Sequence, residues 1–286
     1  MNLVAGATGT LGGMIARGLL ERGESVRILV RPGSPYEALE QAGADVAFGD
    51  VRDPASLAPA FAGVRRAVTT VNSASRGGSD TVESVDLQGN RNLVDAAAAA
   101  GLEHFVFVSA LGGEVDSPIP FMRAKGEAEA YLQRSGVPHT ILKPNIFMEV
   151  WIGMIVGMPV QAGRPVTLVG EGRRRHSFIS IDDVAAFALA VLGQPAALGR
   201  TLVIGGPDAL SWVDVVRTFE RVLGRSIPIE RVAPGEPLPG FPDVVAQLAA
   251  GMDTYDSVID MTGLAREWGV ELTSVEDFAQ RMIAAH

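Results

Sequence analysis

The sequence contains no cysteine among its 286 residues. This absence excludes disulfide bonds, thiolate metal sites and cysteine nucleophiles. Histidine is scarce as well, and its four positions, His104, His139, His176 and His286, do not have the spacing of a metal site. We therefore expect no metal centre in this protein.

Basic residues and long apolar runs are also few. The chain has 24 Lys and Arg against 33 Asp and Glu, so its formal net charge is −9 and its average field repels a nucleic-acid backbone. Its most apolar stretch, Val150–Val160, contains Pro159 and is far shorter than the roughly 20 residues of a membrane-spanning helix. The sequence does not begin with a basic leader and a cleavage site. These features predict a cytoplasmic protein without nucleic-acid or membrane partners, either a monomer or a homodimer.

Hydrophobic residues, in contrast, are plentiful at 47%, which excludes intrinsic disorder as the overall state. The first half of the chain alternates short, continuous apolar runs with longer segments of helical pattern. Continuous runs are typical of strands that are buried on both faces of a parallel sheet. This order predicts an α/β fold, a doubly wound parallel sheet of the Rossmann type. The expected strands are Leu3–Ala5, Val26–Val30, Val46–Phe48, Ala67–Val71, Phe105–Val108 and Thr140–Leu142, and the expected helices are Leu11–Arg22, Pro54–Phe61, Thr81–Ala100 and Phe121–Arg134.

The pattern changes after Pro144, where glycine and proline become frequent and the regular alternation is lost. We expect a Rossmann domain over residues 1–150 and a smaller substrate-binding α/β region over 151–286, with residues 176–205 crossing back to the main sheet. The later elements expected are strands near Phe178–Ile181 and at Thr201–Ile204, and helices at Asp183–Leu192 (with Asp182 as its N-cap), Trp212–Leu223 and Val275–Ala284.

A glycine-rich turn indicates what the domain over residues 1–150 binds, because it stands between the first expected strand and the first expected helix. In such a turn the first glycine permits a sharp exit from the strand, and the second lets backbone N–H groups approach a pyrophosphate. The third glycine lets the helix pack closely on the strand. The helix N-terminus and the threonine hydroxyls favour an anion. The turn predicts a dinucleotide site formed by Gly6, Thr8, Gly9, Thr10, Leu11 and Gly12.

The end of the second expected strand indicates which dinucleotide is bound. Sites for NAD usually place Asp or Glu about 20 residues after the glycines, where it binds the ribose 2′-hydroxyl. Arg31 stands at that place. A carboxylate repels a 2′-phosphate, whereas a guanidinium pairs with it through two parallel hydrogen bonds. We therefore predict NADP(H) as the cofactor.

The ends of the third and fourth expected strands supply further cofactor contacts. Asp50 is expected to accept a hydrogen bond from the adenine amino group, with the Val51 backbone beside it. Val71 and Asn72 belong to a polar loop that is expected to pass under the cofactor. Asp53 is expected to cap the helix that begins at Pro54.

Together these segments resemble the short-chain dehydrogenase/reductase superfamily and, more narrowly, its NmrA-like atypical branch. The resemblance covers essentially the whole length, and it also rests on Val108-Ser109-Ala110, on the segment Ile-Leu-Lys-Pro-Asn-Ile-Phe-Met-Glu at 141–149 and on Ile-Asp-Asp-Val-Ala at 181–185. It implies a Rossmann domain and a substrate cleft between two domains. It also implies an NADP(H) site that includes Lys125, Pro144, Asn145 and Phe147.

The chain departs from the superfamily at one catalytic position. A Ser, a Tyr and a Lys four residues after the Tyr carry the chemistry there: Tyr donates a proton to the carbonyl oxygen, and Lys holds the nicotinamide ribose. Ser109 and Lys125 match, but Phe121 stands where the tyrosine is expected, and a phenyl ring has no proton to donate. The catalytic candidates are therefore Lys125 and Ser109. The proton comes from one of these two, from an ordered water or from the substrate itself.

A group of apolar residues is expected to form the substrate pocket, although each of them fits an ordinary core as well. Such a group suits a flat aromatic ligand. It consists of Ala110, Phe121, Met122, Phe147, Met148, Trp151, Met154 and Met158.

Two functions of different classes fit these residues. The first is an NADPH-dependent reductase of a ketone or quinone-like substrate, aromatic or polycyclic and of the polyketide type, that transfers hydride without the tyrosine. The second is an NADP(H)-binding redox sensor or regulator without turnover, a role known in the NmrA-like branch. Phe121 favours the sensor, and Lys125 with the apolar residues favours the reductase. A nucleotide-sugar epimerase or dehydratase is a third interpretation, and it too would miss the tyrosine.

Overall fold

The computed structural model describes residues 1–74, 77–241 and 243–284 of the chain. His286, one of the four histidines considered above, lies outside the described residues. The chain forms two compact units. The first unit consists of Met1–Pro144 and Val184–Val203, and the second unit consists of Asn145–Asp183 and Ile204–His286.

A seven-stranded sheet in the order β3-β2-β1-β4-β5-β6-β9 forms the centre of the first unit. The pairs among its first six strands are all parallel. The hydrogen bond from Gly199 N to the His139 carbonyl oxygen, 2.7 Å long, joins β9 to β6. The predicted Rossmann-type fold is confirmed, and each of the six strands expected in the first half is present. The strands are β1 (Asn2–Ala5), β2 (Val26–Val30), β3 (Asp45–Phe48), β4 (Arg66–Thr69), β5 (His104–Val108), β6 (His139–Pro144) and β9 (Arg200–Ile204).

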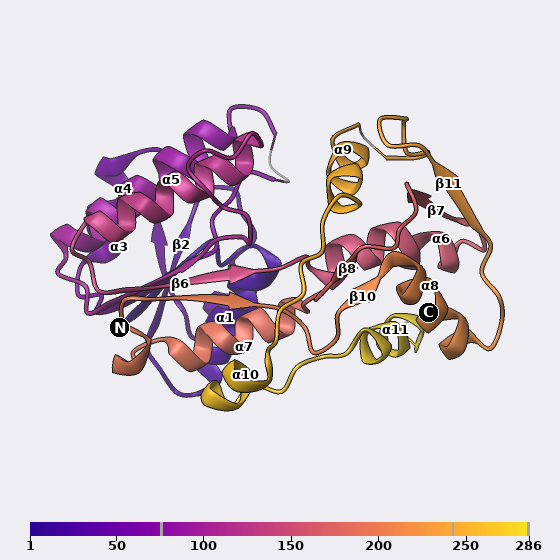
Figure 1. Cartoon of the computed structure of the whole chain (residues 1–286). Helices are drawn as coiled ribbons and strands as arrows, with labels where there is room; N and C mark the ends of the chain where they lie inside the picture. The colour runs from indigo at the N-terminus through magenta and orange to yellow at the C-terminus, as the bar shows by residue number, and fades with distance from the viewer. Residues whose placement is uncertain (75–76, 242, 285–286) are drawn as a thin grey trace. The chain divides into compact units, whose positions relative to one another are not determined.

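Helices cover both faces of this sheet (Figure 1). On one face lie α3 (Pro54–Phe61), α4 (Gln88–Ala99) and α5 (Pro120–Arg134), and on the other lie α1 (Thr10–Glu21) and α7 (Ile181–Val191). Two short elements complete the unit, α2 (Glu37–Gln41) between β2 and β3 and the 3₁₀ helix η3 (Pro195–Ala197) before β9. Phe105 and Phe107 of β5 are buried in the core beneath α4 and α5.

The helix expected over Thr81–Ala100 begins as a π-helix, η1 (Val82–Leu87), and continues as α4. Thr81 and Ser84 form a capping box at the start of η1. The π-helical turns carry Asp86 into the interior, where its side chain has no exposed surface. Asp53 caps α3 as expected, since its side chain accepts a hydrogen bond from Ala55 N.

The second unit combines two small sheets with helices. In one sheet β7 (Val166–Val169) pairs in parallel with β11 (Ile229–Val232), and in the other β8 (Arg175–His176) pairs in antiparallel fashion with β10 (Leu210–Ser211). The helices α8 (Trp212–Leu223) and α11 (Val275–Ala284) have the bounds that the sequence predicts, and Ser211 caps α8. The helices of this unit are the π-helix η2 (Met148–Gly157), α6 (Met158–Gln161), α8 (Trp212–Leu223), α9 (Asp243–Met252), α10 (Thr262–Trp268) and α11 (Val275–Ala284).

Two local predictions near the start of α7 are wrong. The stretch Phe178–Ile181 is not a strand, because β8 lies before it and Ile179 forms an isolated bridge. Asp182 is not the N-cap, because the helix already begins one residue earlier. Ser180 Oγ instead accepts a hydrogen bond from Asp182 N at 3.2 Å, which is the contact that a capping side chain makes.

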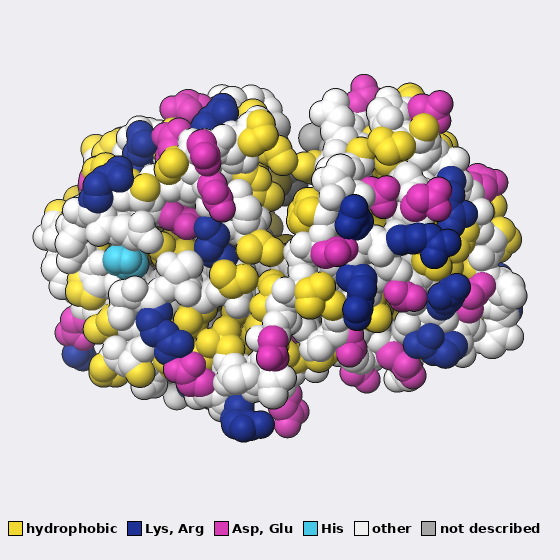
Figure 2. Space-filling view, viewed as in Figure 1, with side chains coloured by type: hydrophobic (Ala, Val, Ile, Leu, Met, Phe, Trp, Pro, Cys, Tyr) yellow, Lys and Arg dark blue, Asp and Glu magenta, His cyan; other side chains and the backbone are white. Residues whose placement is uncertain are grey.

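Acidic and basic side chains are interspersed on the face of the molecule in Figure 2. Oppositely charged side chains of the chain form ion pairs, such as Arg27 with Asp45 at 2.6 Å and Arg65 with Glu103 at 2.7 Å. Among the residues that the structure describes, no helix has both the length and the apolar character needed to cross a membrane.

Candidate functional site

The glycine turn has the geometry that its sequence predicts. Gly6 has a φ of +88°, in the left-handed region that favours glycine, and its carbonyl oxygen accepts a hydrogen bond from Gly9 N at 3.0 Å. A Cβ at Gly12 would lie 2.2 Å from the Gly6 carbonyl oxygen, so a side chain at Gly12 is excluded. No side chain caps the start of α1, and its first turn has no acidic residue. The N–H groups of the first helical residues, Thr10 to Gly12, lie at the positive end of the helix dipole and are therefore available to a phosphate.

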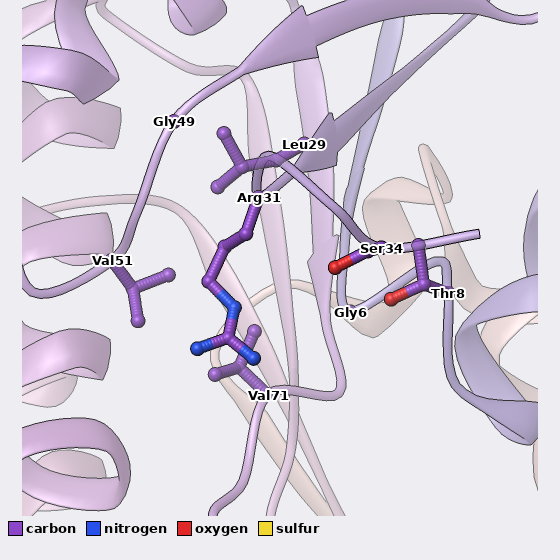
Figure 3. Close-up of a pocket in the computed structure, with 8 residues that line it drawn as sticks. All are labelled: Gly6, Thr8, Leu29, Arg31, Ser34, Gly49, Val51 and Val71. Atoms are coloured by element: carbon purple, nitrogen blue, oxygen red, sulfur yellow. The ribbon is translucent and has the colours of Figure 1, made fainter. Parts of the chain in front are cut away.

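A pocket adjoins this turn (Figure 3). The Arg31 side chain extends between Val51 and Val71, and Thr8 and Ser34 contribute hydroxyl groups to the same pocket. The structure thus brings together predicted cofactor residues from the ends of β1, β2 and β4 and from the loop after β3, and it adds Ser34, which the sequence analysis did not name. The lining residues are Gly6, Thr8, Leu29, Arg31, Ser34, Gly49, Val51 and Val71.

The other residues predicted at this turn and at the end of β4 have different surroundings. Gly9 and Thr10 are exposed and Leu11 is half-buried at the start of α1. Asn72 uses its side chain locally, since Nδ2 donates to the Thr70 carbonyl oxygen at 3.3 Å and Oδ1 accepts from Ala74 N at 3.0 Å. A contact between any of these residues and the cofactor stays a prediction.

Arg31 belongs to a group of two arginines and two aspartates, which we call the arginine cluster (Arg31, Asp50, Arg52 and Asp80). Arg31 Nη1 donates to Asp80 Oδ2 at 2.6 Å, and Arg52 Nη1 lies 2.9 Å from Asp80 Oδ1. One carboxylate therefore bridges two guanidinium groups. Both arginine side chains keep about a third of their surface exposed, whereas that of Asp80 is 6% exposed.

Asp50, the residue predicted to bind adenine, is held within the arginine cluster. Arg52 Nη2 donates to Asp50 Oδ2 at 2.6 Å, and Arg52 Nε contacts both carboxylate oxygens at 3.1 Å. These hydrogen bonds lower the pKa of the Asp50 carboxyl, against the raising effect of its burial. Asp50 is thus ionised at neutral pH, and its contact with the adenine amino group stays a prediction.

Both lysines of the chain belong to a second group, which we call the lysine cluster (Asp86, Ser109, Lys125, Glu129 and Lys143). Lys125 comes from α5 and is only 3% exposed. Its Nζ lies 3.7 Å from Asp86 Oδ1 and donates to the Val71 carbonyl oxygen at 3.3 Å. The Phe107 and Phe121 rings flank the ammonium, with their centroids 5.3 and 5.6 Å from Nζ. The expected proximity of Phe121 and Lys125 is therefore present in the structure.

These surroundings change the acidity of Lys125. Burial lowers the pKa of its ammonium, and the negative charges of Asp86 and Glu129 partly oppose that shift. Asp86 is itself held in place, because its Oδ2 accepts from Ser73 N at 3.0 Å and from Ser73 Oγ at 2.6 Å. A buried lysine with a lowered pKa releases its proton more readily than a lysine in water.

Ser109 and Lys143 meet at Glu129, one helical turn after Lys125 on α5. Ser109 Oγ donates a hydrogen bond to Glu129 Oε1, and Lys143 Nζ binds Glu129 Oε2 at 3.0 Å. Lys143 Nζ also donates to the Gly113 carbonyl oxygen at 2.7 Å. The single hydroxyl proton of Ser109 thus points to a carboxylate. A direct catalytic role for Ser109 stays a prediction, and it requires this hydrogen bond to open.

The apolar residues predicted for the substrate pocket differ in exposure. In the first unit Ala110, Phe121 and Met122 are half-buried, so each keeps accessible surface. In the second unit Met148 is fully buried in the hydrophobic core. It therefore fits the alternative that it is a core residue better than a role in the substrate pocket. The half-buried or exposed residues of the second unit are Phe147, Trp151, Met154 and Met158.

Two further residues predicted for the cofactor site, Pro144 and Asn145, are also buried. Pro144 ends β6 in the first unit. Asn145 begins the second unit, where its Nδ2 donates to the carbonyl oxygens of Ser177 and Ser257, both at 3.0 Å. The Asn145 side chain therefore ties three segments of its own unit together, and its contact with a cofactor stays a prediction.

The sequence analysis missed three acidic residues of these clusters. Glu129 stands four residues after Lys125, and this helical spacing was a usable signal. Asp80 and Asp86 lie 49 and 39 residues from the basic side chains they contact, and no local pattern marked them. Within the described part of the chain, no group of His, Asp and Glu is arranged to hold a metal ion.

Curated relatives match most of the chain. It is 34% identical over 230 residues to the photosystem II assembly factor Ycf39 of Cyanophora paradoxa, covering 80% of this chain and 71% of that protein. It is 31% identical over 227 residues to the NAD(P)H azoreductase of Xenophilus azovorans, covering 79% and 75% of the two chains.

Among solved structures, the NADPH-dependent quinone oxidoreductase QOR2 of Escherichia coli, in complex with NADPH, aligns with a TM-score of 0.83 at 22% identity. The alignment covers 99% of this chain and 100% of that chain, and at this identity it establishes the shared fold. A model of the NmrA-like family matches residues 2–279. The chain therefore belongs to the NmrA-like family, as its motifs predicted.

Proposed function

We propose that this protein is an NADPH-dependent reductase of quinone-like or other flat aromatic acceptors. One observation carries the proposal: the pocket beside the glycine turn and the lysine cluster meet at Val71. The Val71 side chain lines the pocket that contains Arg31, and its carbonyl oxygen accepts a hydrogen bond from Lys125. A dinucleotide bound at Arg31 and across the glycine turn would therefore lie beside Val71, which contacts both the pocket and Lys125.

The residues of the first unit fit NADP(H). Gly6 and Gly12 leave no room for a side chain between β1 and α1, and the uncapped start of α1 faces a pyrophosphate. Arg31 offers a guanidinium to the 2′-phosphate. When bound, the cofactor supplies the hydride, and the protein supplies its position and the proton. The azoreductase relative is named for NAD(P)H and the quinone oxidoreductase was solved with NADPH, which supports this choice.

Lys125 is the proton source in this proposal. Phe121 has no ionisable group, and the Ser109 hydroxyl is directed at Glu129. The ammonium of Lys125 is buried, has a lowered pKa and lies between two aromatic rings. It stabilises negative charge that develops on an acceptor oxygen and gives up a proton to it. The negative charges of Asp86 and Glu129 favour the charged form of Lys125 against the effect of burial.

The acceptor class follows from the surroundings of Lys125. Phe121 and Met122 are half-buried on the same helix, so the approach to the lysine is apolar on this side. Aromatic and thioether side chains suit a flat, polarisable ring system. The names of the azoreductase and the quinone oxidoreductase point to acceptors of this kind. A polyketide-type ketone is the narrower substrate that we propose.

A second candidate is an NADP(H)-binding regulator or assembly factor without turnover. The 34% identity with a photosystem II assembly factor favours it, and so does the phenylalanine at position 121. Both candidates need the same cofactor site, so cofactor binding alone does not separate them. Turnover does.

The test has two parts. Calorimetric titration with NADPH should give saturable binding, and its absence would overturn both candidates. NADPH is then mixed with the protein and a panel of quinones, azo dyes and aromatic ketones, and the loss of the reduced nicotinamide absorbance is followed together with the reduced product. Consumption of NADPH matched by product supports the reductase. Tight binding without turnover across the panel supports the regulator.

A further inference from the structure

We propose that Asp80 is a specificity-determining residue of the cofactor site, an internal anion that competes with the 2′-phosphate of NADP(H) for Arg31. This inference rests on the proposed binding of NADP(H) at the glycine turn. It adds Asp80, which lies nine residues after Val71, to a site that otherwise draws on the ends of β1, β2 and β4 and on the loop after β3. Its consequence is a lower preference for NADP(H) over NAD(H) than Arg31 alone would give.

The Asp80 carboxylate already occupies one of the Arg31 donors that a bound anion would use. Arg31 Nη1 lies 2.6 Å from Asp80 Oδ2, which is a short, charge-assisted hydrogen bond. Arg31 also lines the pocket beside the glycine turn, whereas Asp80 does not belong to that lining. A carboxylate and a phosphate use the same donors of a guanidinium. A 2′-phosphate that takes those donors therefore has to displace Asp80 from Arg31.

Asp80 keeps a second partner when it leaves Arg31. Its other oxygen, Oδ1, lies 2.9 Å from Arg52 Nη1, and Arg52 Nη1 also donates to Ser79 Oγ at 2.8 Å. Arg52 is in turn anchored to Asp50 by three hydrogen bonds between their side chains. The displaced carboxylate thus remains paired, and the exchange is reversible without leaving a charge isolated.

The charges of the arginine cluster explain why this competition affects selectivity. Two guanidinium groups and two carboxylates sum to zero, so the cluster presents no net positive charge to an arriving phosphate. Without the Asp80 charge, the remaining three groups carry one net positive charge. Electrostatic attraction then favours the cofactor with the 2′-phosphate. The cofactor with a 2′-hydroxyl gains much less, because it brings no charge to this position.

The variant Asp80→Asn tests this directly, since it removes the charge and keeps the shape. Dissociation constants for NADPH and NADH are measured by calorimetry, and those for adenosine 2′,5′-bisphosphate and 5′-AMP are measured in the same way. We expect the variant to bind NADPH and the bisphosphate about tenfold more tightly, with a change of less than about threefold for NADH and 5′-AMP. Unchanged or weaker binding of the 2′-phosphate ligands would overturn the proposal, because Asp80 would then orient Arg31 instead of competing for it.

Two controls separate this effect from a general change of charge. Asp45→Asn removes the partner of Arg27 in an ion pair of the same length, 2.6 Å, which links the starts of β2 and β3. It should leave all four dissociation constants unchanged, and a gain equal to that of Asp80→Asn would refute a local effect. In an Arg31→Ala background, Asp80→Asn should raise NADPH affinity by less than about threefold, because the change of net charge remains but the competition for the Arg31 donors is gone. A persistent tenfold gain there would refute competition at Arg31.

The outcome is independent of catalysis. If the wild-type protein binds neither nucleotide, the proposed function fails. If it binds both and Asp80→Asn alters neither affinity, only the role of Asp80 fails. Circular dichroism and a thermal melt of each variant identify a loss of folding. Should Asp80→Asn be unfolded, Asp80→Ser is measured in its place with the same expected direction.

Discussion

The two charged clusters of the first unit differ in how far water reaches them. In the arginine cluster both arginine side chains are about one-third exposed and a ligand can reach them, although their shared partner Asp80 is only 6% exposed. In the lysine cluster Lys125 is 3% exposed and Asp86 is not exposed at all. Charges in water exchange partners at small energetic cost, whereas buried charges are fixed by the penalty of leaving them unpaired. The comparison suggests that the first cluster selects a ligand and the second holds a proton at a defined place.

The largest effect is expected from loss of the buried ammonium. Lys125→Met keeps most of the length and apolar surface of the side chain but removes its proton and charge. We expect kcat to fall by at least about a hundredfold, because general acids contribute roughly that much or more. Steady-state NADPH oxidation measures this. Arg134→Met, at the exposed end of the same helix, is the control and should keep full activity. A Lys125→Met enzyme of normal kcat would remove Lys125 from the mechanism.

The second effect concerns stability and contrasts a buried pair with an exposed one. Glu129→Gln leaves the Lys143 ammonium without its countercharge, with only 13% of the lysine side chain exposed. We expect the free energy of unfolding to fall by about 3 kcal/mol, as for other broken buried ion pairs. Glu103→Gln breaks an ion pair of similar length, 2.7 Å, whose side chains are more than half exposed on average, and it should have a much smaller effect. Urea denaturation of both variants checks the contrast, and equal losses would contradict it.

The third effect concerns the arginine cluster and the binding of its proposed ligand, NADPH. Arg31→Ala should weaken NADPH binding by roughly ten- to a hundredfold, because a charge-assisted contact with the 2′-phosphate is lost. NADH affinity should stay within about twofold. Arg27→Ala, four residues earlier on β2, is the matched control and should affect neither cofactor. Calorimetric titration gives all of these constants. An equal loss for NADPH and NADH would show that Arg31 does not recognise the 2′-phosphate.

The sequence predicted most residues of the pocket beside the glycine turn, because short local segments of the chain determine where these residues lie. Three glycines, a strand end and one arginine lie on consecutive elements, and the parallel sheet brings strand ends to one edge. The spacing of Phe121 and Lys125 on one helix was equally reliable, since helical geometry places them on one face. These are constraints of stereochemistry that do not depend on the rest of the chain.

The charged partners could not be predicted in the same way. Asp80 follows an irregular segment whose path depends on tertiary packing, and Asp86 is buried by a π-helical turn that no residue pattern announced. Asp182 shows the same limit on a smaller scale. It is a good capping residue by type, but Ser180, two residues earlier, takes the capping position. The residue types correctly predicted a capping side chain at this helix end, but they assigned it to the wrong position.

The smallest expected effect is a shift in the pH dependence of turnover. It tests whether Lys125 of the lysine cluster carries the proton that the reaction uses. Asp86 raises the pKa of Lys125 against the lowering effect of burial. In Asp86→Asn the amide oxygen should keep the two hydrogen bonds from Ser73, because an NH₂ group cannot accept them, and the NH₂ group then faces Lys125. The negative charge is lost, so the pKa of Lys125 falls further.

The direction of that shift follows from which form of Lys125 is active. The reaction needs the protonated ammonium, so kcat declines as the pH rises through the pKa of Lys125. A lower pKa moves this alkaline limb to lower pH, by roughly one unit if Asp86 contributes about 1.4 kcal/mol to the charged form. Asp95→Asn removes the negative charge of an α4 residue that accepts a hydrogen bond from the Tyr131 hydroxyl, and it should leave the limb in place. An alkaline limb that stays fixed in Asp86→Asn would assign the proton to a group other than Lys125, and the lysine cluster would then be structural.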